Sequence, residues 1–361
     1  MERIIKDLND TSKNYVYSPM AIYYALLLLV QTTAGDTKQE ILDVLETKES
    51  ELIQDGKLIR KALDIKEDTN KIILNSSLWL SNRFNFNVQN IKDIVRLNEC
   101  EINIGKMGSK EFDEQIHDWI NSNTNNLLKD SVCKIKTEPF TLLELFSTLY
   151  IKGNWIKQFN RRNTTKDKFV LKNDEKVDCK YMNNYIEGNV LFGKRFKAFV
   201  MRMSLVGDMI FILPYEGLLP EDIKNDHDLL ELLQGNINAL LSKNYLVDFS
   251  LPKFDVMCDL DLKSSLESLG IIKAFDYKEA DFTPLSYEKE LCITKANHTS
   301  RLKVDENGLE AAAYVEMAIG FGGMFHETPE LIQFKLNRPF MFSVVKNSYP
   351  LFIGTLMNPN S

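Results

Sequence analysis

The sequence predicts a single α+β domain over residues 1–361. Apolar residues recur at helical spacing in the first third of the chain, whereas runs rich in β-branched and aromatic residues prevail after it. No long linker, repeat or low-complexity tract separates the two kinds of segment. A chain of 361 residues can build one large core. We therefore expect the helices and strands to share one core.

The first helices follow from capping signals and apolar periodicity. The opening stretch MERIIKDLND predicts a short amphipathic helix. Ser18 and Pro19 form a typical N-cap and first-turn pair before the apolar run Met20 to Val30, which predicts a buried helix.

Two further helices are expected before residue 130. Thr37 and Glu40 have the spacing of a capping box at the start of a helix whose apolar face holds Ile41, Val44 and Leu45. A second amphipathic helix is expected over residues 111–128, with Ile116, Trp119 and Ile120 on one side.

Strand character dominates the rest of the chain. Five segments mix apolar runs with alternation and are predicted to form strands: Lys71 to Leu80, Thr141 to Trp155, Asp208 to Gly217, Tyr245 to Phe254 and Gln333 to Val345. Between the last two, Leu262, Leu266 and Leu269 recur at helical spacing, and Gly270 is placed to end that helix.

Composition and charge exclude several classes of partner. The chain is 44% hydrophobic and 26% charged, and its net charge of −7 argues against nucleic acid as a partner. The run Met20 to Val30 is too short to span a bilayer, and no basic patch suggests a membrane surface. Because the first ten residues lack the features of a secretory signal, we expect a cytoplasmic protein, with unconventional secretion as an alternative.

No catalytic, metal or cofactor motif is found, so we expect neither an enzyme nor a bound cofactor or metal. Five cysteines are widely spaced, without a metal-binding pattern, and fit reduced thiols. Four histidines are far apart and lie in no nucleophile or zinc motif. The glycines of GFGGM are not followed by the Lys-Ser/Thr of a phosphate-binding loop.

Five blocks, in order along the chain, resemble the serpins over nearly its whole length. These blocks are NYVYSPMAIYYAL, LYIKGNW, LPKFDVMCDLDLKSSLESLGIIKAF, ITKANHTSRLKVDENGLEAAA, and FKLNRPFMFSVV with PLFIGTLMNP. The short N-terminus looks most like the intracellular poxviral serpins. The resemblance implies three β-sheets, about nine helices and an exposed reactive-centre loop at about 306–332. It also implies a monomer that offers this loop as bait to a target protease.

The resemblance places a hinge at Glu306, Gly308, Leu309, Glu310, Ala311, Ala312 and Ala313. In a segment that must enter a sheet, alternate residues should be apolar, and they are: Leu309, Ala311, Ala313, Val315, Met317 and Ile319. Glu-Ala-Ala-Ala favours a helix on propensity alone, but a helix would have a poorer apolar stripe. The segment therefore suits two states, an exposed loop before cleavage and a strand afterwards.

The candidate bait residues follow from counting along the loop. Counting forward from Glu306, as family alignments do, reaches Phe321, Gly322 or Gly323, whereas counting back from Pro339 lands several residues later. Glycine offers nothing to a specificity pocket, so Phe321, then Met324 or Phe325, are the better bait. They suit a chymotrypsin-like or cathepsin-like protease. The alternative is that these residues pack against the body.

Where serpins place a polar cluster at the sheet opening, this chain has Ser18, Ser147 and His298. His298 is expected to be a hydrogen-bonding gate residue, with an ordinary structural histidine as the alternative. Two hypotheses follow from the resemblance. The first is a suicide-substrate inhibitor, a viral modulator of host proteases. The second is a non-inhibitory serpin that binds a protein partner.

Overall fold

The computed structural model describes residues 2–7, 10–288, 291–309 and 329–361. The predictions for Glu310 to Ala313 and for Phe321 to Phe325 lie outside the described residues.

Helices prevail before residue 135 and strands after it. Ten α-helices are described: α1 Glu2–Asp7, α2 Pro19–Thr32, α3 Gly35–Leu45, α4 Glu49–Leu63, α5 Val88–Asn98, α6 Lys110–Asn123, α7 Lys129–Val132, α8 Pro220–Ile223, α9 His227–Leu233 and α10 Lys263–Leu269. Short 3₁₀ turns form at η1 Arg161–Asn163, η2 Ile237–Ala239 and η3 Lys273–Phe275.

The strands are between 2 and 17 residues long. They are β1 Tyr15–Tyr17, β2 Ile65–Lys66, β3 Lys71–Ser81, β4 Glu101–Gly105, β5 Leu143–Asn154, β6 Thr165–Val170, β7 Lys176–Phe192, β8 Phe196–Met203, β9 Gly207–Pro214, β10 Leu241–Pro252, β11 Phe254–Asp261, β12 Asn297–Val304, β13 Gly308–Leu309, β14 Leu331–Lys335, β15 Phe340–Lys346 and β16 Tyr349–Leu356.

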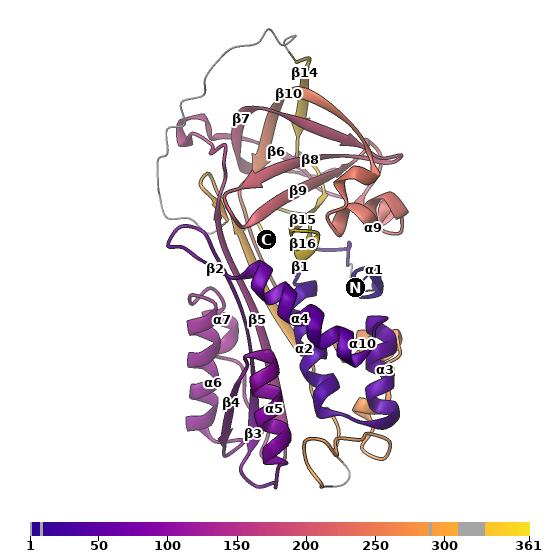
Figure 1. The fold of residues 1–361 in the computed structure, drawn as a ribbon. Helices are drawn as coiled ribbons and strands as arrows, with labels where there is room; N and C mark the ends of the chain where they lie inside the picture. The colour runs from indigo at the N-terminus through magenta and orange to yellow at the C-terminus, as the bar shows by residue number, and fades with distance from the viewer. Residues whose placement is uncertain (1, 8–9, 289–290, 310–328) are drawn as a thin grey trace.

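Backbone pairing joins these strands into two sheets (Figure 1). The upper sheet has the order β1-β16-β15-β9-β8-β7-β10-β14, with β6 paired to β7. The lower sheet has the order β11-β12-β13-β5-β3-β2, with β4 paired to β3. The resemblance implies three sheets; here the long β7 pairs with β6, β8 and β10 and so joins the upper strands into one.

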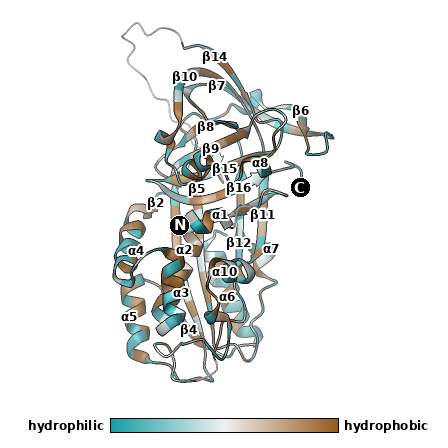
Figure 2. Ribbon diagram, turned by 90° about the vertical axis from the view of Figure 1, so that its right-hand side faces the viewer, coloured by the Kyte–Doolittle hydropathy of each residue, from teal (hydrophilic) through white to brown (hydrophobic). Residues whose placement is uncertain are grey.

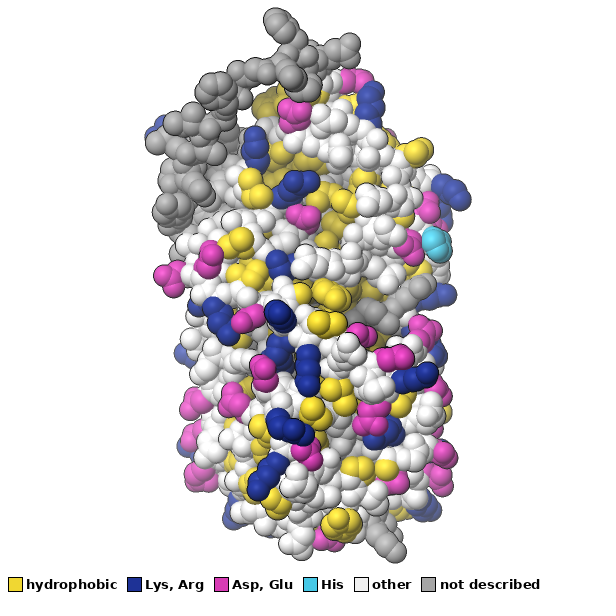
Figure 3. All heavy atoms as spheres, viewed as in Figure 1, with side chains coloured by type: hydrophobic (Ala, Val, Ile, Leu, Met, Phe, Trp, Pro, Cys, Tyr) yellow, Lys and Arg dark blue, Asp and Glu magenta, His cyan; other side chains and the backbone are white. Residues whose placement is uncertain are grey.

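The lower sheet is covered by helices on both faces. The helix α2 contacts β5 on one face, and α6 contacts β3 and β5 on the other. A cluster with Trp79, Phe112, Ile116 and Trp119 fills the α6 side. Figure 2 shows α4 and α5 on one side of the lower body and α6 and α7 on the other. In Figure 3, charged side chains of both signs are scattered over the lower half.

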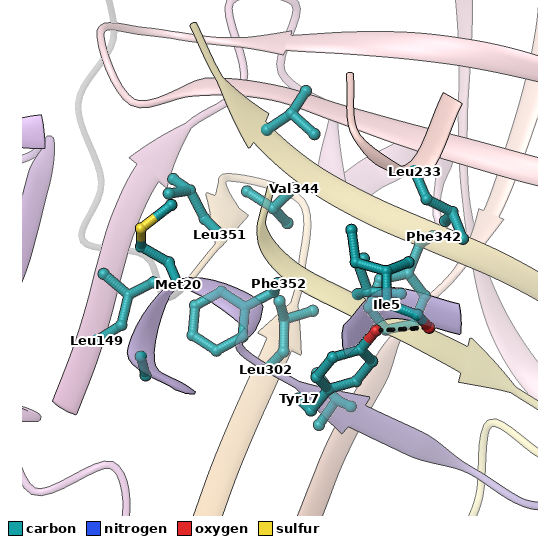
Figure 4. Packing of buried hydrophobic residues seen from close by; sticks show 14 of the residues in the cluster. Ile5, Tyr17, Met20, Leu149, Leu233, Leu302, Phe342, Val344, Leu351 and Phe352 are labelled. Carbon is teal, nitrogen blue, oxygen red and sulfur yellow. Dashed lines mark hydrogen bonds between the residues drawn. The ribbon is translucent and has the colours of Figure 1, made fainter. Parts of the chain in front are cut away.

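The main core lies where the two sheets meet. Figure 4 shows Leu149 of β5 and Leu302 of β12 turned toward one buried cluster, with Met20 and Phe352 beside them. Every one of these side chains is buried. The two strands are therefore anchored to the same core at this level.

Most helix predictions are confirmed. The Ser18 hydroxyl caps α2 by accepting from the Ala21 N–H at 3.1 Å. Gly270 ends α10 with φ of 113°, in the left-handed region. The capping box at Thr37 is wrong, because α3 already begins at Gly35 and the Thr37 hydroxyl accepts from the N–H of Asp281.

Two predicted boundaries differ from the structure. The helix α6 ends at Asn123 and does not reach residue 128, because Asn125 and Asn126 take positive φ angles of 50° and 59°. The segment Gln333 to Val345 forms parts of two strands, β14 and β15. Pro339, which lacks an N–H and restricts the residue before it, lies between them.

Candidate functional site

The chain turns back after β12 and starts a new strand in the middle of the lower sheet. Gly308 pairs with Asn154 and Leu309 with Gly153 of β5, while Leu309 also pairs with Val304 of β12. All of these pairings are antiparallel. The two residues of β13 therefore occupy a strand position between β12 and β5.

Only glycine fits at the start of this strand. A Cβ at Gly308 would lie 1.9 Å from the Gly153 carbonyl oxygen, and φ at Gly308 is 154°. The turn before it is held by hydrogen bonds from the Trp155 N–H to the Asn307 carbonyl at 2.8 Å and from the Asp305 N–H to the Gly308 carbonyl at 3.0 Å. Leu309 then enters the core and is 3% exposed.

Glu306 is buried beside β13, whereas the sequence placed it at the start of an exposed loop. Its carboxylate accepts hydrogen bonds from Lys253 Nζ at 2.7 Å and Thr164 Oγ1 at 2.9 Å, and the residue is 5% exposed. Burial alone would raise the pKa of this carboxyl, but the hydrogen bonds, that from Lys253 foremost, hold the pKa below its usual value. Glu306, Gly308 and Leu309 are therefore buried, while Asn307 between them is partly exposed.

Below β13, the lower sheet has a space that we call the strand gap. In the described part of the chain β5 and β12 are joined only through β13, not to each other. A cavity of about 560 Å³ lies between residues 143–148 of β5 and residues 293–299 at the start of β12. Residues of α2 and α10 line it on one side, and α7 with residues 134–138 on the other.

The structure places Ser18, Ser147 and His298 around one small cavity, and two of them bond each other. The Ser18 N–H donates to Nε2 of the buried His298 at 3.0 Å. Burial lowers the pKa of His298 to about 4, so this nitrogen is a neutral acceptor at physiological pH. Ser147 bonds elsewhere, to the Ser76 hydroxyl at 3.2 Å. Ser147 on β5 and His298 on β12 lie on opposite walls of the strand gap.

Glu144 also lines the strand gap, although the sequence did not single it out. Burial raises the pKa of its carboxyl to about 7, which the charge of Lys295 opposes and those of Asp113 and Glu138 reinforce. Lys295 pairs with Glu138 at 3.1 Å. The alternation around Glu144 predicted a strand, but it did not indicate which charged residue would line a cavity.

The described residues hold no group of three or more His, Cys, Asp or Glu side chains placed to bind a metal. Within the same residues, no helix is both long and apolar enough to cross a bilayer.

The fold and the strand gap define an α+β protein in which the described residues fill only the start of one strand position of the lower sheet. The chain belongs to the serpin family, since the model of the family described as serpin (serine protease inhibitor) matches residues 2–359.

Similar proteins and structures agree with this assignment. A serine protease inhibitor from Cyanea capillata is 28% identical over 359 residues, covering 96% of this chain and 93% of that protein. Neuroserpin from Homo sapiens is 28% identical over 368 residues, covering 97% and 87%. The native-state structure of the thermophilic serpin tengpin has a TM-score of 0.85 at 23% identity, covering 99% of this chain and 92% of that one. Maspin has a TM-score of 0.85 at 21% identity, covering 99% and 96%. At these sequence identities the two structures support the fold alone.

Proposed function

We propose that this serpin inhibits a target protease as a suicide substrate: the protease cleaves the reactive-centre loop, and the freed segment then enters the strand gap. The pairing of β13 carries the proposal, since Gly308 and Leu309 pair with β5 and Leu309 also pairs with β12. This pairing would start the inserted strand in a defined register. The cavity that separates β5 from β12 lies directly below it.

Continuing that register into the strand gap gives the partners of each later residue. Ala311 would lie opposite Ile151 of β5 and Leu302 of β12, both of which are buried in the core. Val315 would lie opposite Ser147 and His298. Because paired residues share a face of a sheet, the apolar set that begins at Leu309 would face the core.

The intervening residues would face the α6 side, where the register offers a matching charge. Glu310 would lie opposite Lys152 on β5 and Lys303 on β12. Opposite charges directly across strands are favourable, so the second residue of the inserted segment would be held from both sides. The same register places Ala318, a small side chain, opposite Glu144 and Lys295.

The test is a panel of apolar-pocket serine and cysteine proteases incubated with the purified protein. We expect a covalent complex that survives SDS, and a higher melting temperature of the cleaved protein. Mass spectrometry of the new N-terminus locates the bond among Phe321, Gly322, Gly323, Met324 and Phe325. Plain cleavage, with no complex and no gain in melting temperature, would instead support a non-inhibitory serpin that binds a protein partner.

The biological setting is a further part of the proposal. The setting that we propose is a viral modulator that acts on host proteases in the cytoplasm of an infected cell, and it rests only on the resemblance to the intracellular poxviral serpins. Fractionation of cells that express the untagged chain tests the location: recovery from the medium would favour unconventional secretion.

A further inference from the structure

We propose that Thr164 is a phosphorylation site for a protein kinase that recognises arginine, and that a phosphate there breaks one of the two side-chain hydrogen bonds that hold the carboxylate of Glu306. The sequence around this threonine is Arg161-Arg162-Asn163-Thr164-Thr165. The modification itself is independent of the proposed function. Only its effect on protease trapping rests on that function.

Two arginines precede Thr164 on an exposed turn. Arg161 and Arg162 lie in η1 and are both exposed, and within the described residues neither guanidinium has an ion pair or a hydrogen bond. The adjoining Asn160 and Asn163 are exposed as well. Two free guanidinium groups, two and three residues before a hydroxyl, are complementary to a kinase whose peptide-binding cleft carries carboxylates.

Thr164 connects this turn to the hinge. Its hydroxyl donates to Oε1 of Glu306 at 2.9 Å, and Lys253 Nζ donates to Oε2 of the same carboxylate at 2.7 Å. Thr164 is half-buried and has extended backbone angles, φ −77° and ψ 120°. A further hydrogen bond, from Asn183 Nδ2 to the Asn163 carbonyl at 2.7 Å, ties the turn to β7. A local opening of this short turn would expose the hydroxyl to a kinase while the sheets stay intact.

The phosphoryl group comes from a nucleoside triphosphate bound with Mg²⁺ to the kinase, and the cytoplasmic setting proposed above contains both. Oγ1 of Thr164 forms a bond to the γ-phosphorus, while the bond from this phosphorus to the β–γ bridging oxygen breaks. A nucleoside diphosphate leaves, and the hydroxyl proton passes to the catalytic carboxylate of the kinase.

A phosphate on Thr164 cannot take the place of the hydroxyl beside Glu306. It carries about 1.5–2 negative charges at pH 7, and the O–H that donated to the carboxylate is gone. Glu306 is buried, so its repulsion with the phosphate is only weakly screened by salt. The exposed guanidinium groups of Arg161 and Arg162 offer the phosphate charge-assisted hydrogen bonds outside. The modified turn would therefore stay open and leave Glu306 with the hydrogen bond from Lys253.

Incubation of the purified protein with Mg²⁺, ATP and an arginine-directed serine/threonine kinase tests the site. We expect about one phosphate per chain, located at Thr164 by mass spectrometry of peptides. Thr164→Val should abolish this incorporation. The matched control Thr165→Val removes the neighbouring exposed hydroxyl and should still be phosphorylated at Thr164. The double variant Arg161→Ala, Arg162→Ala should slow incorporation about tenfold or more.

Three results would overturn the assignment of the site. They are no incorporation into the wild type, phosphate only at residues other than Thr164, and an unchanged rate in the double arginine variant.

Melting temperatures test the effect on the hinge without a protease. Phosphorylated wild type should melt at a lower temperature than the unmodified protein. In Glu306→Gln, which removes the charge and keeps the shape of the side chain, phosphorylation should lower the melting temperature by less than about half as much. An equal decrease in both proteins would overturn the link to Glu306. Where the wild type traps a protease, phosphorylation should lower the yield of complex. Failure to trap any protease would sink the proposed function and leave the phosphate site and the melting temperatures to decide this inference.

Discussion

The substitution Ala311→Arg tests the register that the structure sets for insertion. Leu309 lies opposite Gly153 and Val304, so continued pairing brings residue 311 opposite Ile151 and Leu302. Those two side chains are buried in the main core. An arginine at this position would have to carry its charge into an apolar environment, three residues after the strand begins at Gly308.

The magnitude follows from two opposing free energies. A dozen newly paired residues, at about 0.5–1.5 kcal/mol net for each hydrogen bond, favour insertion by roughly 6–18 kcal/mol. An unpaired buried charge costs several kcal/mol after relaxation. Only the first few hydrogen bonds have formed when residue 311 must enter the sheet. The cost of burying the charge therefore raises the activation free energy of insertion. A barrier higher by about 4 kcal/mol slows insertion about 1,000-fold.

The assay is the partition between trapped and released protease. Ala311→Arg should be cleaved at the wild-type rate, release active protease, and form little SDS-resistant complex. Ala311→Val, which adds apolar volume without charge, should still form complex and serves as the matched control. Complex formation by Ala311→Arg at the wild-type yield would refute the register, because residue 311 could not then face the core.

Three further changes probe the bait, the strand gap and the buried ion pair. Phe321→Ala should lower the rate of reaction with an apolar-pocket protease; an unchanged rate would move the bait to Met324 or Phe325. The carboxyl of Glu144 has a pKa of about 7, above its value in the unfolded chain. Burying the charged carboxylate therefore lowers the free energy of unfolding at pH 8, and this loss is absent below about pH 4.5, where the carboxyl is protonated in both states. In urea titrations, Glu144→Gln should therefore raise the free energy of unfolding by about 1–3 kcal/mol at pH 8, with little change at pH 4.5. Glu306→Gln should lower the free energy of unfolding by about 1–2 kcal/mol at pH 7, a modest loss because Lys253 is partly exposed to solvent. The loss should shrink as acid protonates the wild-type carboxyl. An equal loss at pH 3 would contradict an ionic role.

Local signals in the sequence were sufficient for most elements of the fold. The Ser18 cap, the Gly270 stop and the strand alternation of Thr141 to Trp155 each depend on neighbours within a few residues, and the structure confirms them. The capping box at Thr37 failed because a tertiary contact overrode a local pattern: its hydroxyl bonds Asp281, far along the chain. Short-range spacing could not reveal that competition.

The site was less accessible to sequence reasoning, because it depends on which strands become neighbours. The residues Ser18 and His298 meet across 280 positions of sequence, and the family resemblance, not their spacing, suggested the pair. Ser147 was grouped with them but bonds Ser76 on the neighbouring strand β3, a partner set by the register of two antiparallel strands. The role of Lys253 likewise appears only once β11 and β12 are side by side.

The residues that line the strand gap affect how easily β5 and β12 could close onto each other. In the described residues, β5 pairs with β3 from Leu143 to Lys152, whereas its other edge pairs only at Gly153 and Asn154. An apolar lining would favour direct closure of β5 onto β12. Instead the walls carry Glu144, Ser147 and His298, and burial already disfavours charge on both the carboxyl and the imidazole. Closure without an inserted strand would desolvate these groups further. A strand that enters from Leu309 would instead supply backbone donors and acceptors to both edges at once. Each backbone group paired in this way would contribute to the free energy of the proposed insertion.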